Sequence, residues 1–349
     1  MVLNYLAVLD LPQIYSKPSA EALLDTLKLL TTAPPSWDHA NKTHKSDDDS
    51  APVQINPEGV TRYLTSIVSS DLRWIQDEEI KEQIWDQASA RLSERSGRSA
   101  MGTMSRTFRI PTAAEPFELS IHEPAMTGDD LGLKTWAASY LLAKRLVTFG
   151  LVPADTQQRP QVLELGSGTG LVGLAMAGLG AHVVLTDLPS ICPNLAHNAK
   201  ENLEVVGRNG GTTRTAILDW THPTSCEPLP HDDATGDAGP IPTKFPLILA
   251  ADSLYSPDHP RMLVDTIAAW LSEDSSAKVI VEFPYRDAYL PEIKDFRNRM
   301  SELGLRIVEE GEEKGYDDWG VSGDNEDQDD GALVTCWWSC WQRKISTAG

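Results

Sequence analysis

The sequence predicts an α/β fold in which a doubly wound, mostly parallel seven-stranded sheet follows a helical N-terminal extension. From about residue 130, short strands alternate with helices, and the central strands are apolar throughout. This pattern is typical of a parallel sheet that is covered by helices on both faces. The last two strands are joined by an acidic segment instead of a helix, so we expect the last strand to be antiparallel.

The first hundred residues are expected to be helical, with one gap. Apolar residues recur at helical spacing in the stretches 19–30, 60–68 and 80–92, and two short strands are expected at 107–110 and 117–123. The gap is rich in Pro, Asp, Ser and Asn, so we expect a flexible linker there. The predicted divisions are an N-terminal helical segment (1–30), the linker (31–59), a helical extension with short strands (60–125) and the sheet domain (126–349).

The sheet domain can be followed element by element. Apolar runs predict strands at 161–166, 181–187, 215–220, 245–255, 277–286, 305–311 and 332–344. Helical periodicity predicts helices at 131–150, 171–180, 189–206, 259–272 and 291–304. The polar stretch 221–246, rich in proline, is expected to be a surface insertion.

The charge of the chain restricts its partners. The 349 residues include 30 Lys and Arg against 51 Asp and Glu, a formal net charge of −21. A protein this acidic repels phosphate backbones, which argues against nucleic acid and favours a basic peptide, a lysine-bearing surface or a cation. Eleven acidic residues and one lysine fall within 309–330, a segment that we expect to be a loop. Two interpretations of that loop stay open: a solvated segment, or a surface that steers a basic protein.

Other features argue against a membrane, a metal or a disulfide framework. No run approaches the roughly 18 apolar residues of a membrane span, and the first residues lack the basic start of a signal peptide. The four cysteines form no C-x-x-C pair, and Cys336 and Cys340 are expected to be core thiols. The histidines form no metal-binding pattern. We therefore expect a cytoplasmic monomer that binds neither membrane nor metal.

One motif indicates a ligand-binding site. Residues 162–173 read VLELGSGTGLVG, so a buried strand ends in a turn that contains Gly166, Gly168 and Gly170. Glycines allow the backbone to turn sharply and to approach a ligand closely. A dinucleotide fingerprint requires glycine at position 171, which is Leu171. Glu164, two residues before the first glycine, can instead pair with an ammonium group and would repel a pyrophosphate.

This motif resembles the first motif of the class I, seven-β-strand S-adenosylmethionine-dependent methyltransferases, whose fold is Rossmann-like. The remaining motifs follow in order along the chain. Asp187 ends the second strand, where a carboxylate can hold both ribose hydroxyls. Asp219 and Trp220 end the third strand, where the indole offers a flat apolar face for adenine. The resemblance implies that S-adenosylmethionine is the cofactor.

Further residues narrow the resemblance to methyltransferase family 16. The fourth strand is followed by D-x-x-Y, formed by Asp252 and Tyr255, and LKTW places Trp136 before the glycine strand. The text around Asn198 and Asn202, and the stretches LRWIQDEEIKEQIWDQASARLSERSGR and ELSIHEPAMTGDDLGLKTW, also resemble this family, in particular fungal members that methylate a lysine of translation elongation factor 2. The resemblance implies a protein-lysine N-methyltransferase with elongation factor 2 as its protein partner.

The resemblance also implies roles for individual residues. The expected catalytic residues are Asp252 and Tyr255. The expected cofactor-binding residues are Trp136, Glu164, Gly166, Ser167, Gly168, Asp187, Leu188, Asp219, Trp220 and Ala251. A free lysine has a pKa near 10.4, so its amine must lose a proton before it can attack. We expect Asp252 and Tyr255 to accept hydrogen bonds from this amine and to aim its lone pair, while the proton leaves through water. Glu282 could form an ion pair with Arg286 or line the lysine channel.

Three alternatives remain at this point. A small-molecule N-methyltransferase could use the same core, although it would not explain the long N-terminal extension. A nicotinamide-dependent oxidoreductase is disfavoured by Leu171. A module that binds S-adenosylmethionine without turnover is made less attractive by the intact glycines, Asp187 and Asp252.

Overall fold

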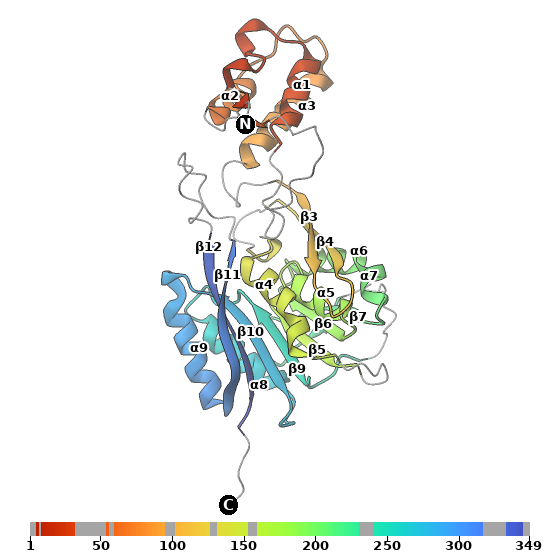
Figure 1. The fold of residues 1–349 in the computed structure, drawn as a ribbon, viewed down its shortest axis with the longest axis vertical. Helices are drawn as coiled ribbons and strands as arrows, with labels where there is room; N and C mark the ends of the chain where they lie inside the picture. Colours follow the sequence, from red (N-terminus) through yellow and green to blue (C-terminus); the bar gives the residue numbers. More distant parts are fainter. Residues whose placement is uncertain are drawn as a thin grey trace, which may run out of the picture. The chain divides into compact units, whose positions relative to one another are not determined.

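The computed structural model describes the chain apart from residues 1–4, 7, 32–53, 56–58, 95–101, 126–130, 153–158, 230–239, 317–332 and 345–349. Most of the expected linker, the centre of the expected insertion and the segment 317–330 lie outside the described residues. The described chain forms two compact units, one that ends at Gly102 and one that begins at Thr103 (Figure 1).

The first unit is helical, as predicted. It contains α1 (Ala20–Leu29), α2 (Val60–Val68) and α3 (Glu78–Glu94), the short 3-10 helices η1 (Val8–Asp10) and η2 (Ile14–Ser16), and a parallel pair of two-residue strands, β1 (Tyr5–Leu6) and β2 (Gln54–Ile55). The apolar helix faces meet in one core, which includes the fully buried side chains of Leu23, Leu27, Leu64, Ile67 and Ile84. This unit therefore has a hydrophobic core of its own.

The second unit contains the predicted sheet. Its seven long strands are β5 (Gln161–Leu165), β6 (His182–Asp187), β7 (Thr212–Ile217), β9 (Leu247–Ala251), β10 (Lys278–Pro284), β11 (Leu305–Tyr316) and β12 (Leu333–Arg343). A two-residue strand, β8 (Glu227–Pro228), extends one edge, so the order is β11-β12-β10-β9-β5-β6-β7-β8. The last strand, β12, is antiparallel to both β10 and β11, which confirms the predicted break in the parallel pattern.

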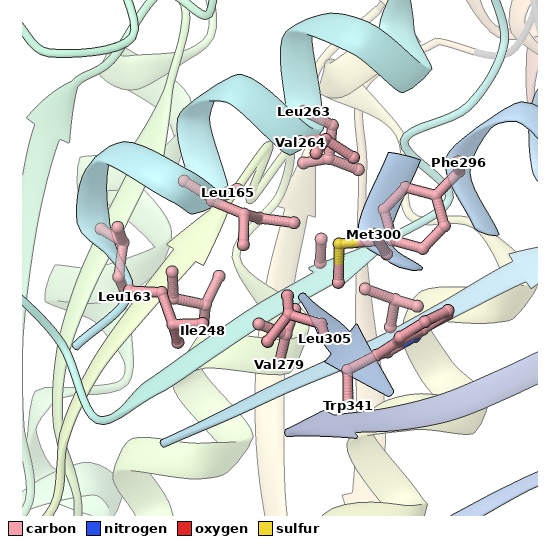
Figure 2. Close-up of a cluster of buried hydrophobic side chains, with 14 of the residues drawn as sticks. Leu163, Leu165, Ile248, Leu263, Val264, Val279, Phe296, Met300, Leu305 and Trp341 are labelled. Atoms are coloured by element: carbon pink, nitrogen blue, oxygen red, sulfur yellow. The ribbon is translucent and has the colours of Figure 1, made fainter. Parts of the chain in front are cut away.

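Helices cover both faces of this sheet. On one face, α8 (His259–Trp270) and α9 (Leu290–Glu302) pack on the strands through a large hydrophobic core. Figure 2 shows this core, in which Leu165 of β5 and Ile248 of β9 lie among side chains of both helices. The other helices are α4 (Ala137–Arg145), α5 (Leu171–Gly178), α6 (Cys192–Glu201) and α7 (Leu203–Gly207). A hairpin of β3 (Met104–Ile110) and β4 (Phe117–Glu123) packs against α5, α6 and α7.

The single helix predicted over 131–150 is wrong. The chain forms a 3-10 turn, η5 (Leu131–Leu133), then an extended residue at Trp136, then α4 and a second 3-10 helix, η6 (Leu146–Phe149). Local periodicity could not show this, because the interruption depends on distant contacts. The N–H of Thr135 donates to Oε1 of Glu123 on β4 over 3.0 Å, and both residues are buried.

The helix predicted over 189–206 is also interrupted, at Asn202 between α6 and α7. The amide groups of Asn198 and Asn202 pair with the backbone of β4, as a neighbouring strand would. Each side chain accepts one N–H and donates to one carbonyl, Asn198 at His122 and Asn202 at Ser120, over 2.7–3.1 Å. These side chains cover the free edge of β4.

Part of the expected acidic loop is a strand. β11 continues to Tyr316, five residues beyond the predicted end, because its backbone pairs with β12 over its whole length. Two of its acidic side chains are ion-paired: Glu313 with Arg145 at 2.5 Å and Glu310 with Arg297 at 3.3 Å. Some of the acidity of 309–330 is therefore matched by bases of the folded unit.

The structure also bears on the cysteines and on a membrane. All four cysteines are free thiols, and Cys336 and Cys340 are buried, as predicted. Within the part of the chain that the structure describes, no helix combines the length and apolar character needed to cross a bilayer. The same residues contain no cluster of three or more His, Cys, Asp or Glu side chains that could hold a metal ion.

Candidate functional site

The candidate site lies at the carboxyl ends of the parallel strands. β5 pairs with β6 on one side and with β9 on the other, so the chain order reverses at β5. Open α/β sheets bind their ligands at such a reversal. The loops that follow β5, β6 and β9 meet here, and they carry most of the residues that the sequence singled out.

The glycine loop requires glycine at three positions, and Gly170, with φ +89°, would place a Cβ 2.7 Å from Cδ1 of Leu195. Gly166 and Gly168 have φ angles of +67° and +55°, which side chains rarely adopt. A Cβ on Gly166 would lie 3.1 Å from the indole of Trp220, and a Cβ on Gly168 would lie 3.1 Å from the carbonyl oxygen of Gly132. The loop is therefore closely covered on two sides, by an aromatic ring and by the backbone of η5.

Asp187 is fixed by backbone donors. The N–H of Gly168 donates to Oδ2 over 2.7 Å, and the N–H of Leu188 donates to Oδ1 over 2.7 Å. Burial raises the pKa of Asp187 to about 6, and the two N–H groups oppose this shift. The carboxylate is thus oriented before any ligand arrives. The neighbouring Leu188 side chain is 44% exposed, although it is large and apolar.

Glu164 lies beneath the loop, facing α5. Its Oε2 is buried, has no hydrogen-bond partner among the described residues, and would lie 2.4 Å from a Cβ on Gly173. Burial raises the pKa of Glu164 to about 8. Ser167 fastens the loop to β6, since it exchanges two hydrogen bonds with Thr186. Gly173 therefore makes room for a buried carboxyl group, a role that the sequence analysis did not assign.

Trp220 and Asp219 follow β7 but have different surroundings. The Trp220 ring is partly buried and lies across Gly166. The Asp219 carboxylate instead turns back on its own loop, where Oδ1 accepts the N–H and the hydroxyl of Thr221 over 2.8 and 2.7 Å. These two bonds lower the pKa of Asp219.

Asp252 has an unusual backbone conformation. It directly follows Ala251, the last residue of β9, and its φ of +52° lies in the left-handed region. Its N–H donates to the carbonyl of Glu282 over 3.0 Å, which holds this conformation at the sheet edge. Strained residues of this kind cluster at functional sites. Its Oδ2 lies 3.9 Å from Nη2 of Arg286.

Tyr255 lies close to two of the expected acids. Its side chain is 43% exposed. Partial burial of the hydroxyl, together with the negative charges of Asp187 and Asp252, raises the pKa of Tyr255 to about 12. The hydroxyl is therefore protonated at neutral pH. The loops after β6 and β9 thus converge on one region, as the sequence predicted.

Trp136 is linked to this region through Arg286. Its indole N–H donates to the carbonyl of Leu131 over 3.1 Å, and the Arg286 guanidinium lies 5.4 Å from the ring centroid. Arg286 therefore contacts both Trp136 and Asp252.

Glu282, for which the sequence left two interpretations, is fully buried on β10. Burial raises its pKa well above the usual value, the charge of Glu313 adds to the shift, and the charge of Arg145 opposes it. The charged groups that act on the Glu282 carboxyl group thus belong to β11 and α4.

Some residues of the site were not assigned from the sequence. Ser253 and His259 frame the loop after β9, and Gly132 covers the glycine loop. Of these three residues, only His259 could have been assigned to the site from the sequence, because it lies four residues after Tyr255 at the start of a predicted helix. Gly132 could not be found in this way, since its contact spans 36 residues of chain.

The residues present fit the cofactor that the resemblance implies. S-adenosylmethionine carries an ammonium, a sulfonium and an adenosine. The buried, unpaired oxygen of Glu164 suits a positive group nearby, and the oriented carboxylate of Asp187 suits ribose hydroxyls. The glycine loop offers close backbone approach, and Trp220 and the exposed Leu188 offer apolar contact.

Comparisons with known proteins agree with this fit. A family model described as lysine methyltransferase matches residues 114–296. The protein-lysine N-methyltransferase rrg1 of Schizosaccharomyces pombe is 30% identical over 334 residues, which cover 95% of this chain and 97% of that protein. The protein-lysine N-methyltransferase EFM2 of Saccharomyces cerevisiae is 33% identical over 264 residues, 70% of this chain but 58% of its own length. The EEF1A lysine methyltransferase 3 of Xenopus tropicalis is 29% identical over 107 residues, 31% of this chain and 40% of that protein.

Proposed function

The chain belongs to the lysine methyltransferase family, and we propose that it transfers a methyl group from S-adenosylmethionine to a lysine of a translation elongation factor. The observation that carries the active-site assignment is the conformation of Asp252. Asp252 is a non-glycine residue in the left-handed region at the end of β9, beside the glycine loop, and this supports a role for its carboxylate in receiving the substrate amine.

The cofactor half of the site is assigned as follows. The backbone of Gly166 and Gly168 approaches the cofactor, and Asp187 accepts hydrogen bonds from the ribose. Trp220 supplies an apolar wall for the adenine, with Leu188 as a second apolar contact. Glu164 places a buried carboxyl group beneath the loop, and a nearby ammonium would favour its ionised form. The remaining expected contacts, Trp136, Ser167, Asp219 and Ala251, line or support the same loops.

The substrate half of the site positions an amine. The bound cofactor supplies an activated methyl group on a positively charged sulfur. Asp252 accepts a hydrogen bond from the lysine amine, and the Tyr255 oxygen accepts another. Because Tyr255 stays protonated, it positions the amine and does not remove its proton. Partial exposure at Tyr255 gives water access to carry the proton away.

An elongation factor is proposed as the substrate on two grounds. The upstream sequence resembles fungal enzymes that act on elongation factor 2, and one relative is named for its action on EEF1A. The net charge of −21 also suits a lysine-bearing basic surface. Elongation factor 2 is the first candidate, because that resemblance extends upstream of the glycine loop into residues 72–98 and 118–136.

The test uses labelled S-adenosylmethionine and an extract from cells that lack this enzyme, so that its substrate is unmethylated. We expect label on a single lysine of elongation factor 2, located by mass spectrometry, and no label with the Asp252→Ala variant. Label on elongation factor 1A would redirect the substrate assignment. Label confined to small molecules, or measurable cofactor binding without any transfer, would contradict the proposal.

A further inference from the structure

We propose that His259 is a positioning residue that ties the loop carrying Asp252 and Tyr255 to the indole of Trp220. The inference rests on the proposed function and adds a residue to it. His259 is the first residue of α8, and its side chain is half-buried between these two parts of the site. Three contacts support the assignment: two reach the loop after β9, and one reaches Trp220.

The first contact is a hydrogen bond to the loop after β9. Nδ1 of His259 lies 3.0 Å from the carbonyl oxygen of Ser253. With the hydrogen on Nδ1 the ring donates to this carbonyl oxygen, and in the other tautomer Nδ1 accepts the N–H of Tyr255 over 3.5 Å, so the ring bonds to the same loop in either form. Ser253 directly follows the left-handed Asp252. This hydrogen bond therefore holds the loop at the point where it could otherwise relax out of the strained conformation.

The other two contacts are made by the ring. The imidazole meets the Tyr255 ring edge to face, with centroids 4.3 Å apart and planes at 84°. It meets the Trp220 ring in the same way, at 6.0 Å and 81°. Edge-to-face pairs at these separations stabilise aromatic clusters. Because Trp220 in turn lies across Gly166, the ring connects the substrate half of the site to the cofactor half.

The charge of the ring is consistent with this role. Burial lowers the pKa of His259, although the Ser253 carbonyl and the Asp258 carboxylate oppose that shift. Tyr255, Trp220 and Ser253 are neutral groups that face the ring from the neighbouring loops. The start of a helix also disfavours a positive charge. A neutral ring adds no repulsion next to a site that is proposed to hold two cations.

The two kinds of contact can be separated by substitution. Asn in place of His259 keeps an N–H donor near the position of Nδ1 but removes the ring. Phe keeps a ring but removes the donor. We expect His259→Asn to raise the dissociation constant of S-adenosylmethionine about fivefold, since the Trp220 contact is lost, and to lower kcat less than His259→Phe does, since only the Tyr255 ring contact is lost from the loop. We expect His259→Phe to keep that constant within about twofold and to lower kcat about fivefold to tenfold, since the loop is released.

Asp265→Asn is the matched control, because it changes an exposed carboxylate further along α8 and should alter neither constant. Isothermal titration measures the cofactor constant without any protein substrate. If the wild-type chain methylates no protein lysine, the proposed function fails, while the titrations still decide whether His259 supports the cofactor wall. If Asn and Phe change both constants in parallel with a loss of melting temperature, His259 is only a structural residue and the inference is overturned.

Discussion

The two halves of the site are built in different ways. On the cofactor side, the loop after β5 is held by backbone hydrogen bonds, among them Gly168 to Asp187 and the reciprocal pair between Ser167 and Thr186. On the substrate side, the loop after β9 begins with a strained residue, Asp252, and exposes Tyr255. The loop of the cofactor half is thus held by hydrogen bonds, whereas the loop of the substrate half begins with a residue in the left-handed region.

This difference suggests a division of labour. A cofactor of constant shape is bound best by a preformed cradle, which loses little entropy on binding. A catalytic carboxylate must instead be held where the local backbone does not favour it, and the surrounding fold supplies that energy. Substitutions on the two sides should therefore affect different constants.

The largest effect is expected from Asp252→Asn. It removes the negative charge but keeps the size of the side chain and its tolerance of the left-handed region. We expect kcat to fall about 10²–10³-fold, because the amine is no longer held by a carboxylate. The dissociation constant of S-adenosylmethionine should change less than about twofold. Single-turnover assays and titration calorimetry measure the two quantities, and Asp258→Asn is the control for a lost exposed carboxylate.

The comparison would break down if Asp252→Asn weakened cofactor binding as much as turnover. Asp252 would then belong to the cofactor cradle, and the proposed division between the two loops would be wrong.

The second effect is expected from Gly168→Ala on the cofactor side. The new Cβ would be strained at φ +55° and would lie 3.1 Å from the Gly132 carbonyl. We expect the cofactor dissociation constant to rise about 10- to 100-fold, equivalent to about 1.4–2.8 kcal/mol. Gly150→Ala is a matched control, because Gly150 has φ +57° and open space around it. A similar loss of affinity in both variants would show that backbone strain alone is responsible, and not the cover provided by η5.

The sequence carries more local signals for the cofactor half of the site than for the substrate half, for a physical reason. The spacing of Gly166 and Gly168 and the position of Asp187 at a strand end are local signals, and the structure places all three together. The conformation of Asp252 and the contacts of His259 depend on how β9, β10 and α8 pack. Contacts of that kind leave no periodic trace in the chain.

The same reason explains the errors in the fold. The parallel centre of the sheet was predictable because apolar strands alternate with helices. The break before α4 was not predictable, because it depends on a buried hydrogen bond between the N–H of Thr135 and the carboxyl group of Glu123. The full length of β11 was missed because its glutamates suggest a loop, whereas its pairing with the apolar strand β12 extends it. Long-range partners decided each of these cases.

A third effect concerns pH and Glu164. In the folded state, the pKa of this buried carboxyl group is raised from the usual 4.5 to about 8. Between these two pH values the folded state therefore keeps a proton that the unfolded state has released. The free energy of unfolding should therefore fall as pH rises from about 4.5 to 8, by at most about 1.4 kcal/mol per pH unit. Glu164→Gln should lack this contribution. Urea titrations of both proteins at several pH values measure the difference.

The pKa of Asp187 is also raised, so this residue makes the free energy of unfolding fall with pH in the wild type and in Glu164→Gln alike. The difference between the two proteins therefore reports Glu164. Saturating S-adenosylmethionine should reduce the slope in the wild type, because a nearby ammonium favours the ionised carboxylate. Parallel curves for wild type and variant would show that Glu164 ionises normally and contributes no special charge to the cofactor half.

The smallest effect tests the strain itself. Asp252→Ala and Asp252→Gly both remove the carboxylate, and both should be inactive, but only glycine accepts φ +52° without penalty. We expect the glycine variant to be more stable than the alanine variant by about 1 kcal/mol in urea unfolding. The same pair of substitutions at Lys17, which has φ +53° in the helical first unit, calibrates the difference away from any proposed site. If glycine gave no advantage at Asp252 but did so at Lys17, the fold around β9 would relax freely. The substrate half would then hold no strain, and its contrast with the cofactor half would lie in exposure alone.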